Sequence, residues 1–273
     1  MKPAAFDLVR AASVPEATRL LGEANGDARL VAGAQSLGPM LNLRLAQPRI
    51  LIDITGIPEL TRIEATNEAV TIGACVTTAN IEDGCLPGRG LEPLGQVAAQ
   101  IAYRAVRNRG TIGGSLCHAD PAADWVSALS ALGAECLIAS GQSRRHLPVE
   151  QFVTAAYENA LGANELLEAI RVPRLTEYAR YGYYKICRKA GEFALAIGVV
   201  LNDQERGQVR LAIGATKGRP IVVSNAGELL HPDKTLNKAA VLNVFDRHGI
   251  TDRIDRRQKN AAVERAFALA RAP

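Results

Sequence analysis

The fold of this chain is decided by the stretch Arg107-Asn108-Arg109-Gly110-Thr111-Ile112-Gly113-Gly114-Ser115-Leu116-Cys117-His118-Ala119-Asp120-Pro121-Ala122-Ala123-Asp124. Its glycine doublet stands between the end of one predicted helix and the start of another, with small hydroxyl residues on both sides. Such a backbone can approach a flat or anionic group closely, because glycine has no Cβ. A second stretch of the same character is Val31-Ala32-Gly33-Ala34-Gln35-Ser36-Leu37-Gly38-Pro39-Met40. We expect the two loops together to hold the pyrophosphate of one cofactor.

The glycines of both stretches permit positive φ, so that successive backbone N–H groups can converge into an anion-binding nest. Gly110, Gly113 and Gly114 would supply it in the longer stretch, and Gly33 in the shorter one. Hydrogen bonds to a charged group contribute about 1.5–3 kcal/mol each, so several would hold a pyrophosphate without a lysine. Neither loop matches a nucleotide fingerprint, since Pro39 stands where a phosphate loop has lysine. Taken alone, each loop is equally well explained as an ordinary tight turn.

The composition is that of a globular protein. Of the 273 residues, 48% are apolar and 22% charged, and this length favours more than one domain. The formal net charge of +4, with no dense Lys/Arg stripe, argues against a nucleic-acid partner. The longest apolar runs, such as residues 193–201, are too short to span a membrane. Residues 1–7 do not have the pattern of a signal peptide, so we expect a cytoplasmic protein.

The 5 cysteines form no C-x-x-C pair, and their spacing does not suit zinc or an iron–sulfur cluster. A disulfide framework is not expected in a reducing compartment. We therefore expect most of them to be small buried hydrophobes, and we predict no metal site in this chain. These cysteines are Cys75, Cys85, Cys117, Cys136 and Cys187.

The first part of the chain is predicted to form a small β–α–β unit. Ser13 and Glu16 have the spacing of a capping box, which predicts a helix from there to about residue 24. The glycine loop at Gly33 would then follow the carboxyl end of a strand, where open α/β sheets bind ligands. The predicted elements after the first helix are a strand at 29–32, a short helix at 37–45 and a strand at 50–54.

The middle of the chain is predicted to contain two long helices. Residues 91–105 place their apolar side chains on one face, as an amphipathic helix does. After the glycine doublet, Asp120 would cap a new helix with Pro121 at its first position and Gly133 beyond its end. The predicted strands are a hairpin at 60–66 and 69–74, and further strands at 135–139, 145–149 and 165–172.

The pattern changes after Pro173, and we place a domain boundary near residues 174–177. Strands in close succession then predict a three-stranded antiparallel meander, and polar helical segments complete the chain. The predicted strands are 178–188, 193–201 and 209–215, and the predicted helical segments are 226–230, 235–245 and 255–272.

Arg104, Arg107 and Arg109 form a basic cluster before the longer glycine loop. They would attract an anionic cofactor, but cations are also expected at the C-terminus of any helix. Lys185 is equally ambiguous, because a strand lysine is usually solvated. Directed toward a redox ring, it would instead place positive charge beside a developing anion.

His118, Asp120 and Asp124 resemble an acid–base group, but no partner nucleophile accompanies them. Asp120 has the simpler role of capping a helix. Asp124, one turn further on, is placed to accept hydrogen bonds from a ribose or a ring.

Together these residues resemble the FAD-binding medium subunit of molybdenum hydroxylases, the carbon monoxide dehydrogenase and xanthine dehydrogenase group. The family's first loop is A-G-G-x-S-L-x-P-x-M-x-x-R-L, which residues 32–45 match with Ala34 in place of the second glycine. Its second loop, R-N-x-G-T-I-G-G-S/N followed by A-x-P-x-x-D, matches residues 107–124 almost throughout. The pattern K-x-x-R-x-x-G-D/E-F/Y-A matches residues 185–194.

The resemblance implies an α+β fold with FAD held between two α/β subdomains, at 1–56 and 57–175. A C-terminal domain with a three-stranded antiparallel sheet and helices would follow at 176–273. Phe193 stands where relatives often have tyrosine, and residues 255–258 lack a tyrosine that relatives often carry. The implied FAD-binding residues are Ala32, Gly33, Ala34, Gln35, Ser36, Leu37, Thr111, Ile112, Gly113, Gly114 and Ser115 at the pyrophosphate and adjoining parts, His118 and Asp124 in the same cleft, and Leu167, Lys185 and Phe193 near the isoalloxazine.

The resemblance also implies a function. A large subunit would carry the molybdenum cofactor, a small subunit would carry [2Fe-2S] clusters, and this chain would carry FAD and pass electrons to an external acceptor. The assembly would be a heterotrimer or a dimer of heterotrimers. No side chain is expected to act as a covalent catalyst. The alternatives are a self-contained FAD-dependent oxidoreductase and an assembly subunit that has lost FAD, an idea that Ala34 keeps open.

The glycine doublet provides a local test. Gly114→Val is expected to abolish flavin retention while the antiparallel C-terminal domain stays folded. Visible absorbance of the purified chain measures the flavin. A Gly114→Val chain that stays as yellow as the wild type would contradict the assignment.

Overall fold

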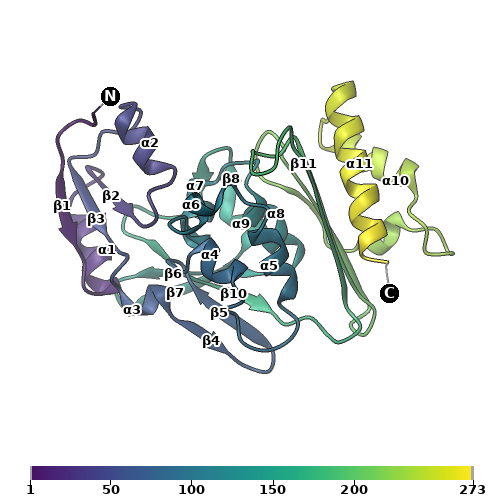
Figure 1. Cartoon of the computed structure of the whole chain (residues 1–273), viewed down its shortest axis with the longest axis horizontal. Helices are drawn as coiled ribbons and strands as arrows, with labels where there is room; N and C mark the ends of the chain where they lie inside the picture. The colour runs from purple at the N-terminus through teal and green to yellow at the C-terminus, as the bar shows by residue number, and fades with distance from the viewer. Residues whose placement is uncertain (1, 272–273) are drawn as a thin grey trace.

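Three larger β-sheets follow one another along the long axis of the molecule, and each takes its strands from one continuous part of the chain (Figure 1). The computed structural model describes residues 2–271. The first sheet lies at the N-terminal end, the second in the middle, and the third beside the C-terminal helices. One larger sheet therefore falls within each of the ranges 1–56, 57–175 and 176–273, and the fold is α+β.

The first sheet is entirely parallel, with strand order β1-β3-β2. The predicted β–α–β unit is confirmed, but strand β1 was not predicted. The side-chain oxygen of Ser13 accepts the backbone N–H of Glu16 at 3.3 Å and begins helix α1 as the capping pattern indicates. The elements are β1 (Asp7–Arg10), α1 (Val14–Glu23), β2 (Ala28–Val31), α2 (Leu37–Asn42) and β3 (Ile50–Asp53), so the predicted helix at 37–45 ends earlier than expected.

The second sheet is antiparallel, with order β4-β5-β10-β6-β7. Helices α4, α5, α7 and α8 contribute to the hydrophobic core beneath it, with Trp125 almost fully buried among them. The strands are β4 (Ile63–Ala65), β5 (Ala69–Gly73), β6 (Glu135–Ser140), β7 (Ser143–Pro148), β8 (Val153–Ala155), β9 (Glu158–Asn159) and β10 (Leu166–Pro173). The helices are α3 (Pro58–Thr61), α4 (Thr78–Glu82), α5 (Glu92–Ala98), α6 (Arg104–Arg107), α7 (Ile112–His118), α8 (Asp124–Ala131) and α9 (Val149–Phe152).

The third sheet has four strands in the order β11-β12-β13-β14, so the prediction of three was wrong. Strand β14 is only three residues long and follows Pro220, which gives it no periodicity that a sequence pattern could reveal. The predicted strand at 193–201 begins only at Ala196, which leaves Phe193 in the preceding turn. The elements are β11 (Arg180–Ile186), β12 (Ala196–Asp203), β13 (Gln208–Gly214), β14 (Ile221–Val223), the 3-10 helix η1 (Ala226–Leu229), α10 (Lys238–Arg247) and α11 (Arg253–Leu269).

The third sheet is covered on both faces, by α8 on the inner side and by α11 on the outer side. Two glycines let α11 approach closely. A Cβ at Gly182 would lie 1.9 Å from the carbonyl oxygen of Ala266, and one at Gly198 would lie 2.5 Å from that of Ala262. The helix backbone therefore rests directly on strands β11 and β12. The predicted end of this helix at Ala272 lies outside the described residues.

The prediction of one helix over residues 91–105 was wrong, because the chain forms two short helices there, α5 and α6. Between them, Ala102 has φ of 44°, in the left-handed region that no α-helix accepts. The guanidinium of Arg107 stabilises this break by donating to the carbonyl oxygens of Ile101 at 2.9 Å and Ala102 at 3.0 Å. A local change of backbone conformation thus interrupts a continuous helical pattern.

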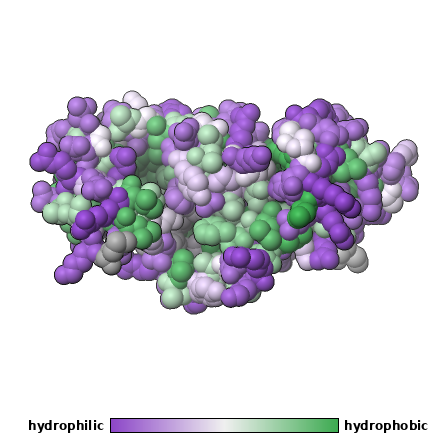
Figure 2. Space-filling view, turned by 90° about the horizontal axis from the view of Figure 1, so that it is seen from above, coloured by the Kyte–Doolittle hydropathy of each residue, from purple (hydrophilic) through white to green (hydrophobic). Residues whose placement is uncertain are grey.

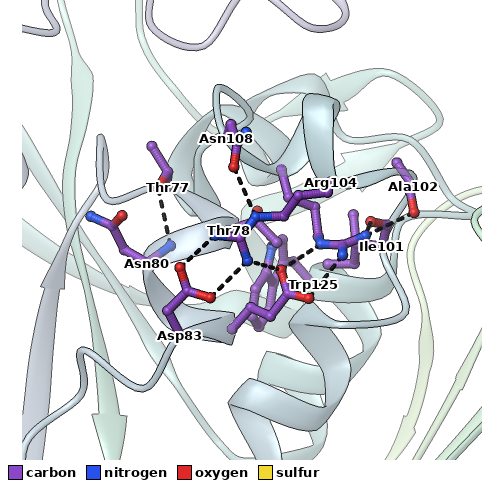
Figure 3. A network of polar contacts seen from close by, with 11 residues as sticks. Thr77, Thr78, Asn80, Asp83, Ile101, Ala102, Arg104, Asn108 and Trp125 are labelled. Carbon is purple, nitrogen blue, oxygen red and sulfur yellow. Dashed lines mark hydrogen bonds and ion pairs between the residues drawn. The ribbon is translucent and has the colours of Figure 1, made fainter.

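Two of the three arginines that precede the longer glycine loop, Arg104 and Arg107, anchor α6 to α4 (Figure 3). Arg107 makes two hydrogen bonds to the carboxylate of Glu82, and Arg104 pairs with Glu82 at 2.8 Å and with Asp83 at 2.5 Å. Beside this network, Trp125 donates to the hydroxyl of Thr78 at 3.3 Å. These two arginines therefore hold the scaffold together and are not available to an anionic ligand.

Arg107→Met is expected to lower the free energy of unfolding by about 2 kcal/mol at neutral pH, because two carbonyls and Glu82 lose a largely buried charged donor. Urea denaturation followed by fluorescence of Trp125, the single tryptophan, measures the loss in this part of the molecule. Arg62→Met is the control, since the Arg62–Glu64 pair is exposed and contributes little.

The difference in the free energy of unfolding between wild type and Arg107→Met should also depend on pH. Arg107 lowers the pKa of Glu82 below its ordinary value of 4.5, so the ion pair contributes fully above that value. The contribution is lost as the pH falls through the lower pKa of the folded state. The stability difference between wild type and Arg107→Met should therefore shrink in acid. An equal difference at pH 7 and at pH 3 would contradict this role.

Candidate functional site

The two glycine-bearing loops meet backbone to backbone. A Cβ at Gly33 would lie 2.0 Å from the carbonyl oxygen of Arg109 and 2.9 Å from the Cα of Gly110. No side chain fits in that space, and Gly33 is buried. The predicted pairing of the two loops is therefore present in the structure, and the absence of a Cβ at Gly33 permits it.

The first loop presents unused hydrogen-bond donors. From Gly33 to Leu37, five successive backbone N–H groups have no protein acceptor among residues 2–271. Ala34 lies in the left-handed region at φ 58°, and the side chain of Gln35 donates to the carbonyl oxygen of Gly33 at 3.1 Å. Successive backbone N–H groups around a residue in the left-handed region form the nests that bind anions. This loop therefore has the free backbone donors that the predicted anion-binding nest requires.

Ala34 has the conformation that the family's second glycine would adopt without cost. An L-residue at this φ loses about 1 kcal/mol relative to glycine, because its Cβ crowds the following carbonyl. Alanine at this position therefore strains the loop slightly.

The second loop behaves differently from the prediction that its glycines form a nest. The N–H of Ile112 donates to the carbonyl oxygen of Val76 at 3.1 Å, and that of Gly113 donates to Ala74 at 3.0 Å. The N–H of Gly114 donates to the side chain of Thr111, which caps helix α7. These donors are consumed inside the protein, so the expected nest at this position was wrong.

The two glycines of the doublet differ in their surroundings, because Gly113 is packed closely and Gly114 is exposed. A Cβ at Gly113 would lie 2.4 Å from the Cβ of Ala74, so this glycine lets α7 rest against the end of β5. Gly114 is exposed and Ser115 is half-buried near the start of α7. Ile112 is fully buried in the core, and Thr111 is 5% exposed. Only part of the predicted stretch is thus accessible to a ligand.

The helix predicted to begin at Asp120 begins at Asp124, with Ala123 as its cap. Helix α7, which was not predicted, ends at His118, and Ala119 stops it with φ of 52°. Asp120 instead accepts the N–H of Ala122 at 2.8 Å in a tight turn. Its role as a helix cap was therefore wrong, and it shapes the link between two helices.

His118 lies half-buried at the end of α7, with its ring 5.3 Å from that of Tyr157. Tyr157 itself is 62% exposed, and its hydroxyl is 3.5 Å from the carboxylate of Asp120. His118 and Asp120 thus lie at one surface position, but Asp124 does not join them.

Asp124 is buried against the C-terminal sheet. Lys185 lies 2.9 Å from its Oδ1 and 3.2 Å from its Oδ2, and the hydroxyl of Tyr183 donates to Oδ1. Burial raises the pKa of the Asp124 carboxyl, while Lys185 and Tyr183 oppose part of that rise. Burial and the charge of Asp124 also hold the pKa of Tyr183 well above its ordinary value, so this hydroxyl remains a donor. Tyr183 was not predicted, although Tyr183 and Lys185 alternate on one strand face, which is the signal that links them.

The remaining predicted residues have contrasting surroundings. Leu167 is 3% exposed in β10, next to a bulge, and its side chain belongs to the main core. Phe193 is 66% exposed in the turn before β12. The neighbouring Gly191 lies against the carbonyl of Ala102 and the ring of Tyr103, itself 63% exposed. Figure 2 shows apolar surface gathered at the centre of one long face of the molecule.

The cysteines are less buried than expected. Cys75 and Cys136 are buried, Cys117 and Cys187 are half-buried, and Cys85 is exposed. Burial raises the pKa of Cys75 and that of Cys117 to about 12, which keeps both thiols protonated and unreactive.

Across residues 2–271, no helix combines the length and the apolar character that crossing a membrane requires.

Residues 4–175 match the family described as the FAD binding domain in molybdopterin dehydrogenase. This covers both glycine loops, the buried Asp124 and more than half of the chain. The chain belongs to this family, the FAD-binding medium subunits of molybdenum-containing oxidoreductases.

Curated relatives agree with this assignment. The chain is 32% identical to caffeine dehydrogenase subunit beta of Pseudomonas sp. (strain CBB1), over 100% of this chain and 96% of the relative. It is 36% identical to the carbon monoxide dehydrogenase medium chain of Hydrogenophaga pseudoflava, over 83% and 79% of the two chains.

Solved structures show the same fold over the full length. Carbon monoxide dehydrogenase from Hydrogenophaga pseudoflava has a chain with a TM-score of 0.90 and 32% identity, covering 99% of this chain and 98% of that one. Quinoline 2-oxidoreductase from Pseudomonas putida 86 has a chain with a TM-score of 0.87 and 28% identity, covering 99% and 98%. The similarity extends through the C-terminal sheet and helices.

Gly33→Ala is expected to raise the FAD dissociation constant at least tenfold, because the new Cβ would collide with the backbone of Arg109 and separate the loops. FAD titration of the purified chain, followed by flavin fluorescence, measures the effect. Gly38→Ala is the matched control: its Cβ would meet only the Cβ of Ala34, at 3.9 Å, and should leave affinity within twofold. Equal losses in both variants would show that loop contact is not the cause.

Proposed function

We propose that this chain is the FAD-carrying electron-transfer subunit of a multi-subunit molybdenum hydroxylase. The observation that carries the proposal is the row of N–H groups from Gly33 to Leu37, which have no acceptor within residues 2–271 and begin where Gly33 lies against the backbone of Arg109. A pyrophosphate is an acceptor of suitable charge for several converging backbone donors. The backbone donors of this loop therefore suit the pyrophosphate of FAD, the cofactor named in the description of the matching family.

In this proposal the backbone of residues 33–37 binds the pyrophosphate, and Ala32 helps to line the loop. Thr111, Gly114 and Ser115 border the same space from the start of α7. Ile112 and Gly113 act by packing α7 on the second sheet, because their side chains and N–H groups are used inside the protein. His118 closes one side of the cleft. The ranges 1–56 and 57–175 are the two FAD-binding parts, and 176–273 is the C-terminal domain.

Three further residues complete the proposed flavin environment. Phe193 is exposed and free to lie against an aromatic ring, whereas Leu167 supports the site from the core. The charges of Asp124 and Lys185 neutralise each other. The pair would therefore contribute to flavin binding by fixing the position of the segments that carry it.

Bound FAD accepts electrons singly and releases them singly or in pairs, which is the chemistry that an electron-transfer subunit needs. The protein would bind the cofactor, orient it and shield it, and no side chain takes part as a nucleophile. The proposed partners are a small subunit with [2Fe-2S] clusters and a large subunit with the molybdenum cofactor. We propose a heterotrimer or a dimer of heterotrimers, located in the cytoplasm, with electrons leaving to an external acceptor.

Co-purification tests this function. The chain, produced with its genomic neighbours, is expected to form a yellow complex whose flavin is reduced under anaerobic conditions when the complex receives its substrate. The chain alone should bind FAD without being reduced by that substrate. Reduction of the isolated chain would instead establish a self-contained oxidoreductase, and a colourless chain within an active complex would establish an assembly subunit.

A further inference from the structure

Two residues of the C-terminal sheet reach into the flavin-binding part of the molecule. Tyr183 and Lys185 occupy alternate positions of β11, so their side chains project from the same face. Both contact the carboxylate of Asp124, which begins α8. Tyr184, between them, points to the opposite face and contacts Arg265 of α11.

Lys185 also contacts a second segment. Its ammonium donates to the carbonyl oxygen of Gln100 at 3.1 Å, in the break between α5 and α6. Gln100 precedes the stretch that contains α6, the glycine doublet and α7, and Asp124 follows that stretch. One ammonium group therefore joins the two segments that flank residues 104–118.

The interaction is shielded from water. The side chain of Lys185 is 3% exposed and that of Asp124 7% exposed. A buried carboxylate and ammonium are costly to leave unpaired, so the geometry of one group fixes that of the other. The hydroxyl of Tyr183 fills a further acceptor position of Asp124 and restricts its rotation.

We propose that Tyr183 is a positioning residue for FAD binding. It orients Asp124, Asp124 holds Lys185, and Lys185 keeps the segments before and after residues 104–118 in register, so that this stretch meets the loop at Gly33. The C-terminal domain thus helps to build the cofactor cleft from outside it. This inference rests on the proposed binding of FAD between the two loops.

The test compares three single-hydroxyl deletions on one strand. Tyr183→Phe removes the bond to Asp124, and Tyr184→Phe removes the bond to Arg265 on the other face. Tyr181→Phe removes a buried hydroxyl that has no protein partner among the described residues. FAD dissociation constants are measured by fluorescence titration of the full chain, at a temperature where thermal unfolding shows each variant to be fully folded.

Tyr183→Phe is expected to weaken FAD binding about tenfold, whereas Tyr181→Phe and Tyr184→Phe stay within twofold of wild type. The visible circular dichroism of the remaining bound flavin should also change in Tyr183→Phe alone. If Tyr183→Phe only lowers the melting temperature, and binds FAD with wild-type affinity and wild-type dichroism, the proposal is overturned.

Lys185 provides a second route if Tyr183→Phe does not fold. Lys185→Gln should weaken FAD binding at least as much, and Lys185→Arg should recover most of the affinity, because arginine restores a cation that can pair with Asp124. Equal affinities for both variants and wild type would overturn the proposal. A wild-type chain that binds no FAD would refute the proposed function instead, so the two failures are distinguishable.

Discussion

The contact between Gly33 and the backbone of Arg109 is the constraint on which the candidate site depends. A single Cβ at Gly33 would lie 2.0 Å from a carbonyl oxygen, so the loops can meet only because that atom is absent. The contact joins a parallel α/β unit to an antiparallel sheet with its own helices. It also sets the first loop, whose backbone donors have no acceptor within residues 2–271, against the residues that lead into α7. The contact is made by two backbones, and side-chain chemistry has a secondary part.

The sequence specifies this site well where the determinants are local. Ser13 and Glu16 predict the start of α1 because a helix cap needs only neighbouring residues. The loops at Gly33 and Gly113 are recognisable because their glycines are required by close contacts, which leaves a motif. The donors of Ile112 and Gly113 were assigned wrongly because their acceptors, Val76 and Ala74, lie after β5, far away in the sequence. Nothing in residues 107–124 reveals those partners.

Other errors arise from local contacts that a helical pattern does not reveal. Residues 91–105 have a helical pattern, yet Arg107 stabilises a break at Ala102 by donating to carbonyl oxygens five and six residues earlier. Asp120 and Asp124 are both reasonable helix-starting residues, and the left-handed Ala119 and the turn at Ala122 decide between them. The hydrogen bond of Tyr183 to Asp124 joins residues 59 positions apart and could not be derived from either motif. The sequence pattern therefore predicts most elements, whereas their exact ends and their distant partners depend on contacts of the folded chain.

The close packing of α11 on Gly182 and Gly198 has a consequence for the substitutions that the third sheet can tolerate. This helix covers the outer face of the strand that carries Tyr183 and Lys185. A side chain at Gly182 or Gly198 would push the backbone of α11 away from β11 and β12. The strand that contacts Asp124 is thus supported from the face opposite to that contact, by a helix that only glycine allows to approach.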